Sequence, residues 1–325
     1  MTHNIQNENQ KEINVEEKDD GIKTLEDLIK ITKSLGRKRK RNSDYSRLGA
    51  LLPDLEELQK MIGMTSIKNA ITAQILFYLQ DLGNNDMLHT VVEGNSGSGK
   101  TIVSKIISKI YLKLGFLENN KFIIAKRSDL IGEYLGQTSV KTQKKIDEAK
   151  GGVLFIDEAY SLGNRYDRDS YSKECIDTLV SNLAERRDFI CIIAGYHDDL
   201  QKCFFAKNQG LERRFPWTFT IDDYTPEELF QIFKKQVEEN NWEVNDDCIT
   251  EDFFKDKMEH FDKMGGATEI LLSKCKITHS RRVFGKPRYL KKIISKEDLL
   301  EAFELFKLHS STNKDGNAPP FTMYM

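Results

Sequence analysis

The chain has 325 residues, enough for one compact α/β domain and a smaller second domain. Its 49 lysine and arginine residues nearly balance its 51 aspartate and glutamate residues, so the overall charge gives no indication of a polyanionic partner. The five cysteines are scattered, which argues against a disulfide framework and predicts a cytoplasmic protein. The histidines lack the spacing of metal ligands, which argues against a zinc-type site. No run of about eighteen apolar residues is present in the sequence, which argues against a membrane span.

Residues 1–50 are expected to form a mostly disordered polar and basic segment. Met1–Gly21 is almost wholly polar and buries too little apolar surface to offset the entropy of ordering. Thr24 and Asp27 have the spacing of a capping box before a short amphipathic helix, which docks on a partner, docks on its own core or frays at the surface. The run RKRKR at Arg37–Arg41 is compatible with a nuclear address, a nucleic-acid contact, a phosphate-attracting tail or a merely solvated segment.

The glycine-rich stretch Val91–Ile102 (VVEGNSGSGKTI) carries the strongest signal in the chain. It has the spacing of a P-loop, with a short apolar strand before it and isoleucines at helical spacing after it. In such a loop the backbone N–H groups meet phosphate oxygens, the lysine reaches the β and γ phosphates, and the threonine hydroxyl completes a Mg²⁺ shell. The alternative is a glycine-rich turn between two elements. The residues expected to bind ATP here are Gly94, Asn95, Ser96, Gly97, Ser98, Gly99, Lys100, Thr101 and Ile102, with Thr101 also expected to bind Mg²⁺.

A second strand, predicted at Phe122–Ala125, opens onto a loop with an aromatic residue at its tip. In the segment RSDLIGEYLGQT, Gly132 and Gly136 flank Tyr134. The loop is too flexible to be core and too apolar at its tip to be merely solvated. An aromatic side chain packed on its own domain is the alternative.

The segment Gly152–Tyr160 (GVLFIDEAY) reads as a buried strand that ends in two carboxylates, as a Walker B strand does. Asp157 is expected to hold Mg²⁺ through water, and Glu158 is expected to orient and polarise the water that attacks the γ-phosphate. The alternative is a core strand with solvated acids at its end.

Two further strands are predicted, at Phe189–Ala194 and Trp217–Ile221, with the arginine pair of LERRF just before the second. Alternating apolar strands and amphipathic helices imply a parallel sheet covered on both faces, with the ligand at the carboxyl ends of the strands. The predicted fold class is therefore α/β, with a three-layer P-loop sheet over residues 51–224.

The character of the chain changes at Thr225. Thr225, Pro226 and Glu228 combine an N-cap, a proline at the first helical position and a capping-box glutamate. A second capping box at Ser295–Asp298 precedes another amphipathic helix. These signals predict a small helical lid domain over residues 225–309 and a loose tail over residues 310–325.

With these motifs in hand, the chain resembles the AAA+ ATPases, in the branch that contains red-type Rubisco activase and stage V sporulation protein K. The resemblance runs from about Leu55 to Arg282, and it implies a ring, usually of six subunits, with ATP held at each interface. Its most specific matches are Ile62-Gly63, Asp129-Leu130 with Glu133–Gly136, Gly151–Leu162, Arg168–Tyr171, Ile176–Leu179, Ala194–Tyr196, and Gly210-Leu211 with Arg214-Phe215.

The resemblance implies roles for several residues outside the P-loop. Arg214 aligns with the arginine finger that reaches the γ-phosphate in a neighbouring subunit, so Glu158, Lys100 and Arg214 are the expected catalytic residues. Its neighbour Arg213 is an alternative finger, and an ordinary surface salt bridge is the alternative for the pair.

Other residues match the family's nucleotide and client contacts. Tyr134 falls at the pore-loop aromatic, which would grip an extended polypeptide by apolar contact. Ile62 and Gly63 match the segment that packs the adenine ring. Tyr196 ends the sequence AGY at the sensor 1 position, where most AAA+ proteins present an asparagine.

One departure concerns the lid. Thr268 stands where closer relatives carry the sensor 2 arginine, which puts the coupling between hydrolysis and lid motion in question. The stretch Leu271–Lys296 holds nine lysine or arginine residues and no acid. Arg281 or Arg282 could substitute for the missing arginine, the basic face could bind a polyanion, or it could simply be solvated.

The expected function is an ATP-hydrolysing remodelling motor that acts on a protein client through the pore of a homo-hexameric ring. A nucleic-acid-directed AAA+ factor, such as a helicase loader, is the first alternative, motivated by the two basic stretches. An ATP-dependent scaffold with little hydrolysis is the second, motivated by Thr268. A cytoplasmic location is expected, a nuclear one is compatible with Arg37–Arg41, and no membrane partner is expected.

Overall fold

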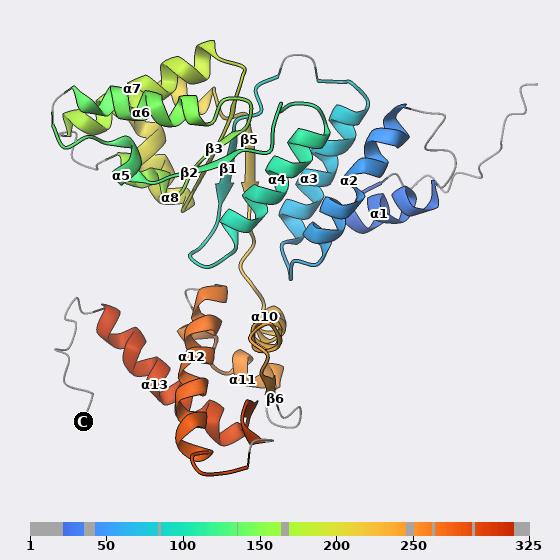
Figure 1. Ribbon diagram of the computed structural model, residues 1–325, viewed down its shortest axis with the longest axis vertical. Helices are drawn as coiled ribbons and strands as arrows, with labels where there is room; N and C mark the ends of the chain where they lie inside the picture. The colour runs from blue at the N-terminus through green and yellow to red at the C-terminus, as the bar shows by residue number, and fades with distance from the viewer. Residues whose placement is uncertain are drawn as a thin grey trace, which may run out of the picture.

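The computed structural model describes residues 22–35, 43–83, 86–134, 136–163, 169–244, 250–261, 264–287 and 290–314. A larger α/β domain and a smaller, mainly helical lid are joined by a short linker after the last strand of the sheet (Figure 1). The boundary expected between residues 224 and 225 falls at the end of this linker, because the first lid helix begins at Pro226.

The larger domain is built on five parallel strands in the order β2-β3-β4-β1-β5. Every residue of β1, β3 and β4 is buried, as expected for central strands that are covered on both faces. Val91 and Val92 belong to different hydrophobic cores, because side chains alternate along a strand. The predicted fold class is confirmed. The strands are β1 (Thr90–Glu93), β2 (Phe122–Ala125), β3 (Val153–Ile156), β4 (Ile190–Gly195) and β5 (Trp217–Thr220).

Helices cover both faces of this sheet (Figure 1). Side chains of α3 and α4 belong to one hydrophobic core, and side chains of α6 and α7 belong to the other. The helices of the larger domain are α2 (Ser43–Gln59), α3 (Thr65–Leu79), α4 (Lys100–Lys113), α5 (Arg127–Leu130), α6 (Gln137–Glu148), α7 (Ser170–Glu185), α8 (His197–Asp199) and α9 (Gln209–Glu212), with shorter helical turns η2 (Ala159–Leu162), η3 (Leu200–Phe204) and η4 (Phe205–Lys207).

A helix ahead of the larger domain, α1 (Leu25–Ser34), packs against α2. It begins with the predicted capping box, in which the Asp27 N–H donates to Thr24 Oγ1 (3.2 Å) and the Thr24 N–H donates to the Asp27 carboxylate (3.1 Å). Leu25 and Leu28 are buried in the core that α1 shares with α2. The prediction of a mostly disordered segment over residues 1–50 therefore does not hold for residues 25–34 and 43–50. The basic run at Arg37–Arg41 lies outside the described residues.

The lid contains four helices and a small parallel pair of strands among its described residues. Both predicted capping boxes are present, at Thr225 with Glu228 and at Ser295 with Asp298. The last helix runs to Lys314, past the predicted end at residue 309. No helix in the described part of either domain is long and apolar enough to cross a membrane. The lid elements are α10 (Pro226–Glu239), β6 (Glu243–Val244), α11 (Glu251–Lys255), η5 (Met258–His260), α12 (Met264–Arg282), β7 (Ile293–Ile294) and α13 (Lys296–Lys314).

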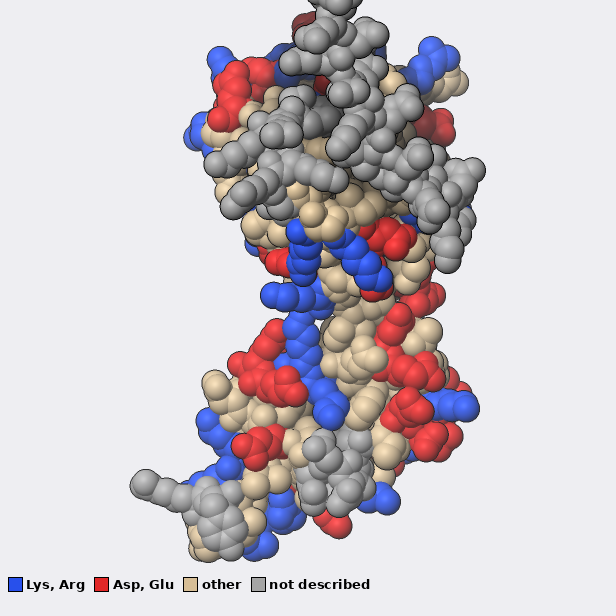
Figure 2. Space-filling model, turned by 90° about the vertical axis from the view of Figure 1, so that its right-hand side faces the viewer, with Lys and Arg blue, Asp and Glu red and all other residues tan. Residues whose placement is uncertain are grey.

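Charges of both signs interleave on the face of the molecule seen in Figure 2. A narrow column of basic side chains crosses the junction between the two domains, and acidic side chains border it in the lid. The basic stretch predicted along α12 is partly neutralised by α13, because Arg281 pairs with Glu301 (3.7 Å) and Arg282 pairs with Asp298 (2.8 Å). On the face in Figure 2, the basic side chains form a narrow column rather than a broad surface of a single charge.

Candidate nucleotide-binding site

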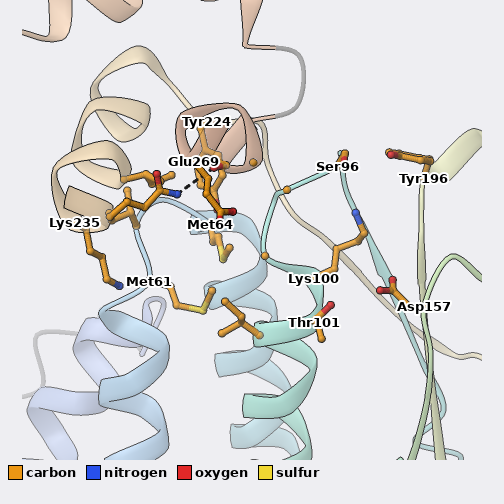
Figure 3. A pocket seen from close by; sticks show the side chains of 18 of the residues that line it. Met61, Met64, Ser96, Lys100, Thr101, Asp157, Tyr196, Tyr224, Lys235 and Glu269 are labelled. Atoms are coloured by element: carbon orange, nitrogen blue, oxygen red, sulfur yellow. Dashed lines mark hydrogen bonds between the residues drawn. The ribbon is translucent and has the colours of Figure 1, made fainter. Parts of the chain in front are cut away.

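A cavity of about 520 Å³ lies between the carboxyl ends of the central strands and the lid (Figure 3). Its volume is typical of a site for a small-molecule ligand. The larger domain and linker contribute Met61, Ile62, Met64, Ser96, Gly97, Gly99, Lys100, Thr101, Ile102, Asp157, Glu158, Tyr160, Gly195, Tyr196 and Tyr224, and the lid contributes Ile232, Lys235, Gln236, Glu239, Gly265, Gly266 and Glu269.

The P-loop adopts a turn that needs glycine. Gly97 and Gly99 have φ values of +70° and +92°, which cost a residue with a Cβ about 1 kcal/mol or more. Gly99 is the N-cap of α4, so the positive end of this helix lies at the cavity and favours an anion there. Of the predicted set, Ser96, Gly97, Gly99, Lys100, Thr101 and Ile102 line the cavity, whereas Gly94, Asn95 and Ser98 do not.

Lys100 is held by the loop that carries it. Its ammonium group donates to the carbonyl oxygens of Gly94 (2.8 Å) and Asn95 (2.7 Å). Burial lowers the pKa of Lys100, and the nearby carboxylates of Asp157 and Glu158 oppose that shift. A β or γ phosphate would offer this cation charged acceptors in place of two neutral carbonyls.

The two acids follow β3 directly, and both line the cavity. The Asp157 N–H donates to the Ala125 carbonyl (3.2 Å), which extends the ladder between β2 and β3 by one residue. Glu158 has φ +51° and ψ 45°, a left-handed conformation that costs a non-glycine residue about 1–3 kcal/mol. Its N–H donates to Asp157 Oδ1 (3.0 Å). This strained turn sets the directions in which the two carboxylates leave the strand.

The residues present fit a magnesium nucleotide better than a metal ion alone. Lys100, Thr101 and Asp157 face the same part of the cavity (Figure 3). In the part of the chain that the structure describes, no group of three or more His, Cys, Asp or Glu side chains is placed to hold a metal. Mg²⁺ is commonly held by one or two protein oxygens together with substrate phosphates. The Thr101 hydroxyl and the Asp157 carboxylate would supply such a pair to a bound Mg²⁺.

An apolar slot forms another part of the cavity. Met61, Ile62 and Met64 line it, and their side chains suit the flat, apolar face of a base. Gly63, between Ile62 and Met64, does not line the cavity, but its φ of +64° forms the turn that places these two residues. A Cβ on Gly63 would approach the Glu228 carboxylate to 2.7 Å. The sequence indicated Ile62 and Gly63 but missed both methionines, because apolar residues beside a turn carry no distinctive spacing.

Tyr196 lines the cavity beside the P-loop lysine. The centroid of its ring lies 5.3 Å from Lys100 Nζ, within the range of a cation–π contact. The ring of Tyr160, from the turn after the two acids, lies 5.5 Å from that of Tyr196. Tyr160 was not predicted, and burial raises its pKa to about 12. Tyr196 thus presents an aromatic face to the cavity.

Two predicted residues lie away from the cavity of their own chain. Tyr134 is 68% exposed. Arg214 lies just after α9 and is half-buried, and its Nε is enclosed without a hydrogen-bond partner among the described residues. Its neighbour Arg213 is exposed. Arg214 could therefore contact a nucleotide only in the site of another subunit. Tyr134 is exposed and free to contact another molecule.

The lid wall of the cavity does not include Thr268, the residue that stands where relatives carry the sensor 2 arginine. Thr268 is fully buried in the lid, where its hydroxyl donates to the Gly265 carbonyl (2.8 Å), and it does not line the cavity. The next residue, Glu269, lines the cavity instead. One residue of an α-helix corresponds to about 100° of rotation, which separates the core from the cavity wall. Arg281 and Arg282, offered above as substitutes, do not line the cavity either.

The α12 end of the lid touches the P-loop itself. A Cβ on Gly265 would approach the Gly97 carbonyl oxygen to 2.9 Å, and one on Gly266 would lie 3.7 Å from the Gly97 Cα. The α10 residues Lys235 and Gln236 also line the cavity, and the Gln236 amide donates to the Gly265 carbonyl (3.1 Å). Lys235 and Gln236 could not be predicted as cavity residues, because polar residues on a helix surface are normally solvated.

The chain is similar to known proteins in its sequence and in its fold. A profile described as "ATPase family associated with various cellular activities (AAA)" matches residues 90–208. A CfxQ-like protein of Acanthamoeba polyphaga mimivirus is 44% identical over 285 residues, 85% of this chain and 70% of that protein. The chloroplastic ribulose bisphosphate carboxylase/oxygenase activase of Cyanidioschyzon merolae is 31% identical over 255 residues, 74% of this chain and 86% of that protein. The FIGL-1 AAA domain in complex with ADP matches the fold with a TM-score of 0.51 at 15% identity, over 81% of this chain and 88% of that chain.

Proposed function

The chain belongs to the ATPase family associated with various cellular activities, and we propose that it hydrolyses ATP in order to remodel a protein client. The observation that carries the proposal is the convergence of Lys100, Thr101, Asp157 and Glu158 on one cavity. These residues come from two segments far apart in the sequence, and the parallel sheet brings them together at the carboxyl ends of β1 and β3.

Hydrolysis transfers the γ-phosphoryl group of ATP to water and gives ADP and phosphate. Lys100 offsets the charge on the β and γ phosphates, and Glu158 accepts a hydrogen bond from the attacking water and polarises it. Mg²⁺, held by Thr101 and Asp157 together with phosphate oxygens, would neutralise charge that develops on the transferred group. Met61, Ile62 and Met64 would hold the base at a distance from this chemistry.

The proposal includes a homo-oligomeric ring, as is typical of the family, in which Arg214 of one subunit serves the site of the next. One feature supports this role: Arg214 does not line the cavity of its own chain, so its guanidinium is available to the site of a neighbouring subunit. A fixed guanidinium at the γ-phosphate stabilises the charge of the transition state and is worth about 10³–10⁵ in rate.

Tyr134 is the proposed contact with the client. Its side chain is 68% exposed, and glycines at positions 132 and 136 flank it. Such an aromatic tip can hold an extended polypeptide by apolar contact, without regard to sequence. The activase of Cyanidioschyzon merolae is named for its carboxylase, but client choice depends on surfaces that vary within a family, so that client is not carried over to this chain.

Steady-state ATP hydrolysis by the full chain, with and without a permanently unfolded polypeptide, tests the proposal. We expect magnesium-dependent hydrolysis that the polypeptide stimulates. Tyr134→Ala is expected to bring the ratio of stimulated to basal rate close to one, and Tyr134→Phe is expected to preserve that ratio. Val140→Ala, at another apolar residue that is 69% exposed, is the matched control.

The same assay separates the alternative functions. Stimulation by single- or double-stranded nucleic acid that declines steeply with salt, without stimulation by polypeptide, would favour a nucleic-acid-directed factor. Tight ATP binding with negligible hydrolysis would favour a scaffold. Either result would contradict the proposed action on a protein client.

A further inference from the structure

The linker between the two domains is bonded directly to the P-loop. Because β5 pairs with β1 in parallel, the linker that follows β5 runs beside the loop that follows β1. The Asn95 side-chain amide donates to the Asp223 carboxylate (2.6 Å). The Tyr224 hydroxyl donates to the Ser98 carbonyl oxygen (3.0 Å). Two P-loop residues that do not line the cavity therefore hold the linker.

Tyr224 lies where the cavity, the P-loop and the lid meet. Its side chain lines the cavity near Met64 and Glu269 (Figure 3), and it is only 6% exposed. Burial raises the pKa of Tyr224 to about 12, so its hydroxyl keeps its proton at neutral pH. The next residue, Thr225, is the N-cap of α10. A movement of the Ser98 carbonyl can therefore reach the first helix of the lid through the Tyr224 side chain and the peptide bond between Tyr224 and Thr225.

The carbonyl that Tyr224 binds belongs to the same peptide group as the N–H of Gly99. That N–H lies at the start of α4, among the groups that donate to phosphate in a P-loop. A phosphate oxygen that accepts from the Gly99 N–H polarises the peptide group, which strengthens the hydrogen bond that its carbonyl accepts on the other side. The strength of the bond between Tyr224 and Ser98 should therefore depend on which phosphates are bound.

The lid wall of the cavity offers no net positive charge that could respond to the bound phosphates. Thr268 is enclosed in the lid, and Glu269, which lines the cavity beside it, is acidic. Lys235 lines the cavity, but its ammonium group lies 4.0 Å from the Glu239 carboxylate. Among the described lid residues at the cavity, the charges thus sum to one negative unit.

We propose that Tyr224 is a positioning residue that couples the phosphate state of the P-loop to the orientation of the lid, in place of a sensor 2 cation. Asp223 provides a second, more exposed link through Asn95. This inference rests on the proposed function, because it requires that the P-loop binds a nucleotide. It assigns the coupling to the linker, although the lid itself contacts the P-loop at Gly265 and Gly266.

Hydrogen exchange of the full chain, measured with ADP and with a non-hydrolysable ATP analogue, tests the proposal. In the parent protein, both nucleotides should protect the P-loop amides, and the analogue should protect the first turn of α10 more than ADP does. Tyr224→Phe removes one oxygen atom and keeps the buried ring. We expect this variant to retain protection of the P-loop and to lose most of the difference at α10, with kcat lower by about fivefold, as for one lost hydrogen bond, and KM changed less.

Tyr171→Phe, on α7 and away from the cavity, is the matched control and should behave as the parent. Asp223→Asn should reduce the difference at α10 by less than Tyr224→Phe does, because the link through Asp223 is exposed to solvent. If the parent shows no protection of the P-loop by either nucleotide, the proposed function itself fails. If the P-loop is protected and α10 responds equally in the parent and in Tyr224→Phe, the role of Tyr224 is overturned.

Discussion

The two walls of the cavity are built in different ways. On the wall formed by the larger domain, positive φ angles at Gly97, Gly99 and Glu158 aim the backbone and the carboxylates. On the lid wall, Lys235 and Glu269 project from helices in ordinary conformations. The family profile covers residues 90–208 and ends before the lid. A wall defined by backbone geometry tolerates few substitutions, whereas a helix face can change its charge by a single substitution.

Loss of Arg214 should have the largest effect, because it removes a charge from a transition state assembled between subunits. Arg214→Ala is expected to lower kcat by about 10³-fold or more, with little change in ATP affinity of the isolated subunit. Arg213→Ala, at the exposed neighbour, should cost less than about tenfold. Steady-state ATPase rates at several protein concentrations measure both. Equal losses in the two variants would contradict the assignment of Arg214 as the finger.

Glu158→Gln, on the cavity wall formed by the larger domain, should abolish most ATP hydrolysis without abolishing ATP binding. The amide cannot polarise water as a carboxylate does, so kcat is expected to fall by about 10²–10⁴-fold while ATP still binds. Single-turnover hydrolysis and ATP titration on the same sample measure the two effects. A variant that hydrolyses ATP within a few-fold of the parent rate would show that Glu158 is not the residue that activates water.

Asp298 supports the lid from within. Its carboxylate accepts from Arg282 Nε (2.8 Å) and lies 2.9 Å from His279 Nδ1, and both the His279 and the Asp298 side chains are only 2% exposed. Asp298→Asn leaves these partners without their buried anion and is expected to lower the free energy of unfolding of the lid by about 3–5 kcal/mol. Glu301→Gln, at the exposed partner of Arg281, should cost less than about 1 kcal/mol. Urea unfolding followed by Trp242 fluorescence in a Trp217→Phe background measures both.

The pH dependence of that effect has a definite sign. Burial alone would raise the pKa of Asp298, but hydrogen bonds from Arg282, the Ser295 N–H and His279 outweigh it and lower the pKa to about 2 from 3.8. The stability that Asp298 contributes is therefore fully present above pH 4 and is lost as the pH falls toward 2. The difference between the parent and Asp298→Asn should shrink over that range, and a difference that grows there would contradict this account of the network.

The contrast between the walls also explains what the sequence could predict. The P-loop and the two acids are local patterns, in which residue type and spacing alone dictate the chemistry, and six of the nine predicted P-loop residues line the cavity. Tyr224, Lys235 and Glu269 come together only through the packing of the lid on the larger domain. The sequence could not tell which face of α12 lines the cavity: Thr268 is buried in the lid and Glu269, one residue further on, lines the cavity.

The smallest expected effect concerns the charge of the lid wall. Glu269→Arg replaces an anion of the cavity wall by a cation and is expected to lower the Kd for the anionic ATP by about fivefold, an effect that weakens with salt. Glu269→Gln, which only removes the negative charge, should lower the Kd by less. Nucleotide titrations at two salt concentrations measure these shifts. Unchanged affinity in both variants would place Glu269 too far from the nucleotide to matter.

ATP is predicted to bind between the P-loop and the lid. Calorimetric titration of the folded chain with magnesium and ATP tests this prediction most directly, with Lys100→Ala as the disruptive variant and Lys105→Ala, at an exposed lysine five residues further along α4, as the control. We predict a Kd between about 1 μM and 1 mM for the parent and for Lys105→Ala, and a Kd at least about 100-fold weaker for Lys100→Ala. A parent that does not bind ATP, or a Lys100→Ala variant that binds it as tightly as the parent, would contradict the claim.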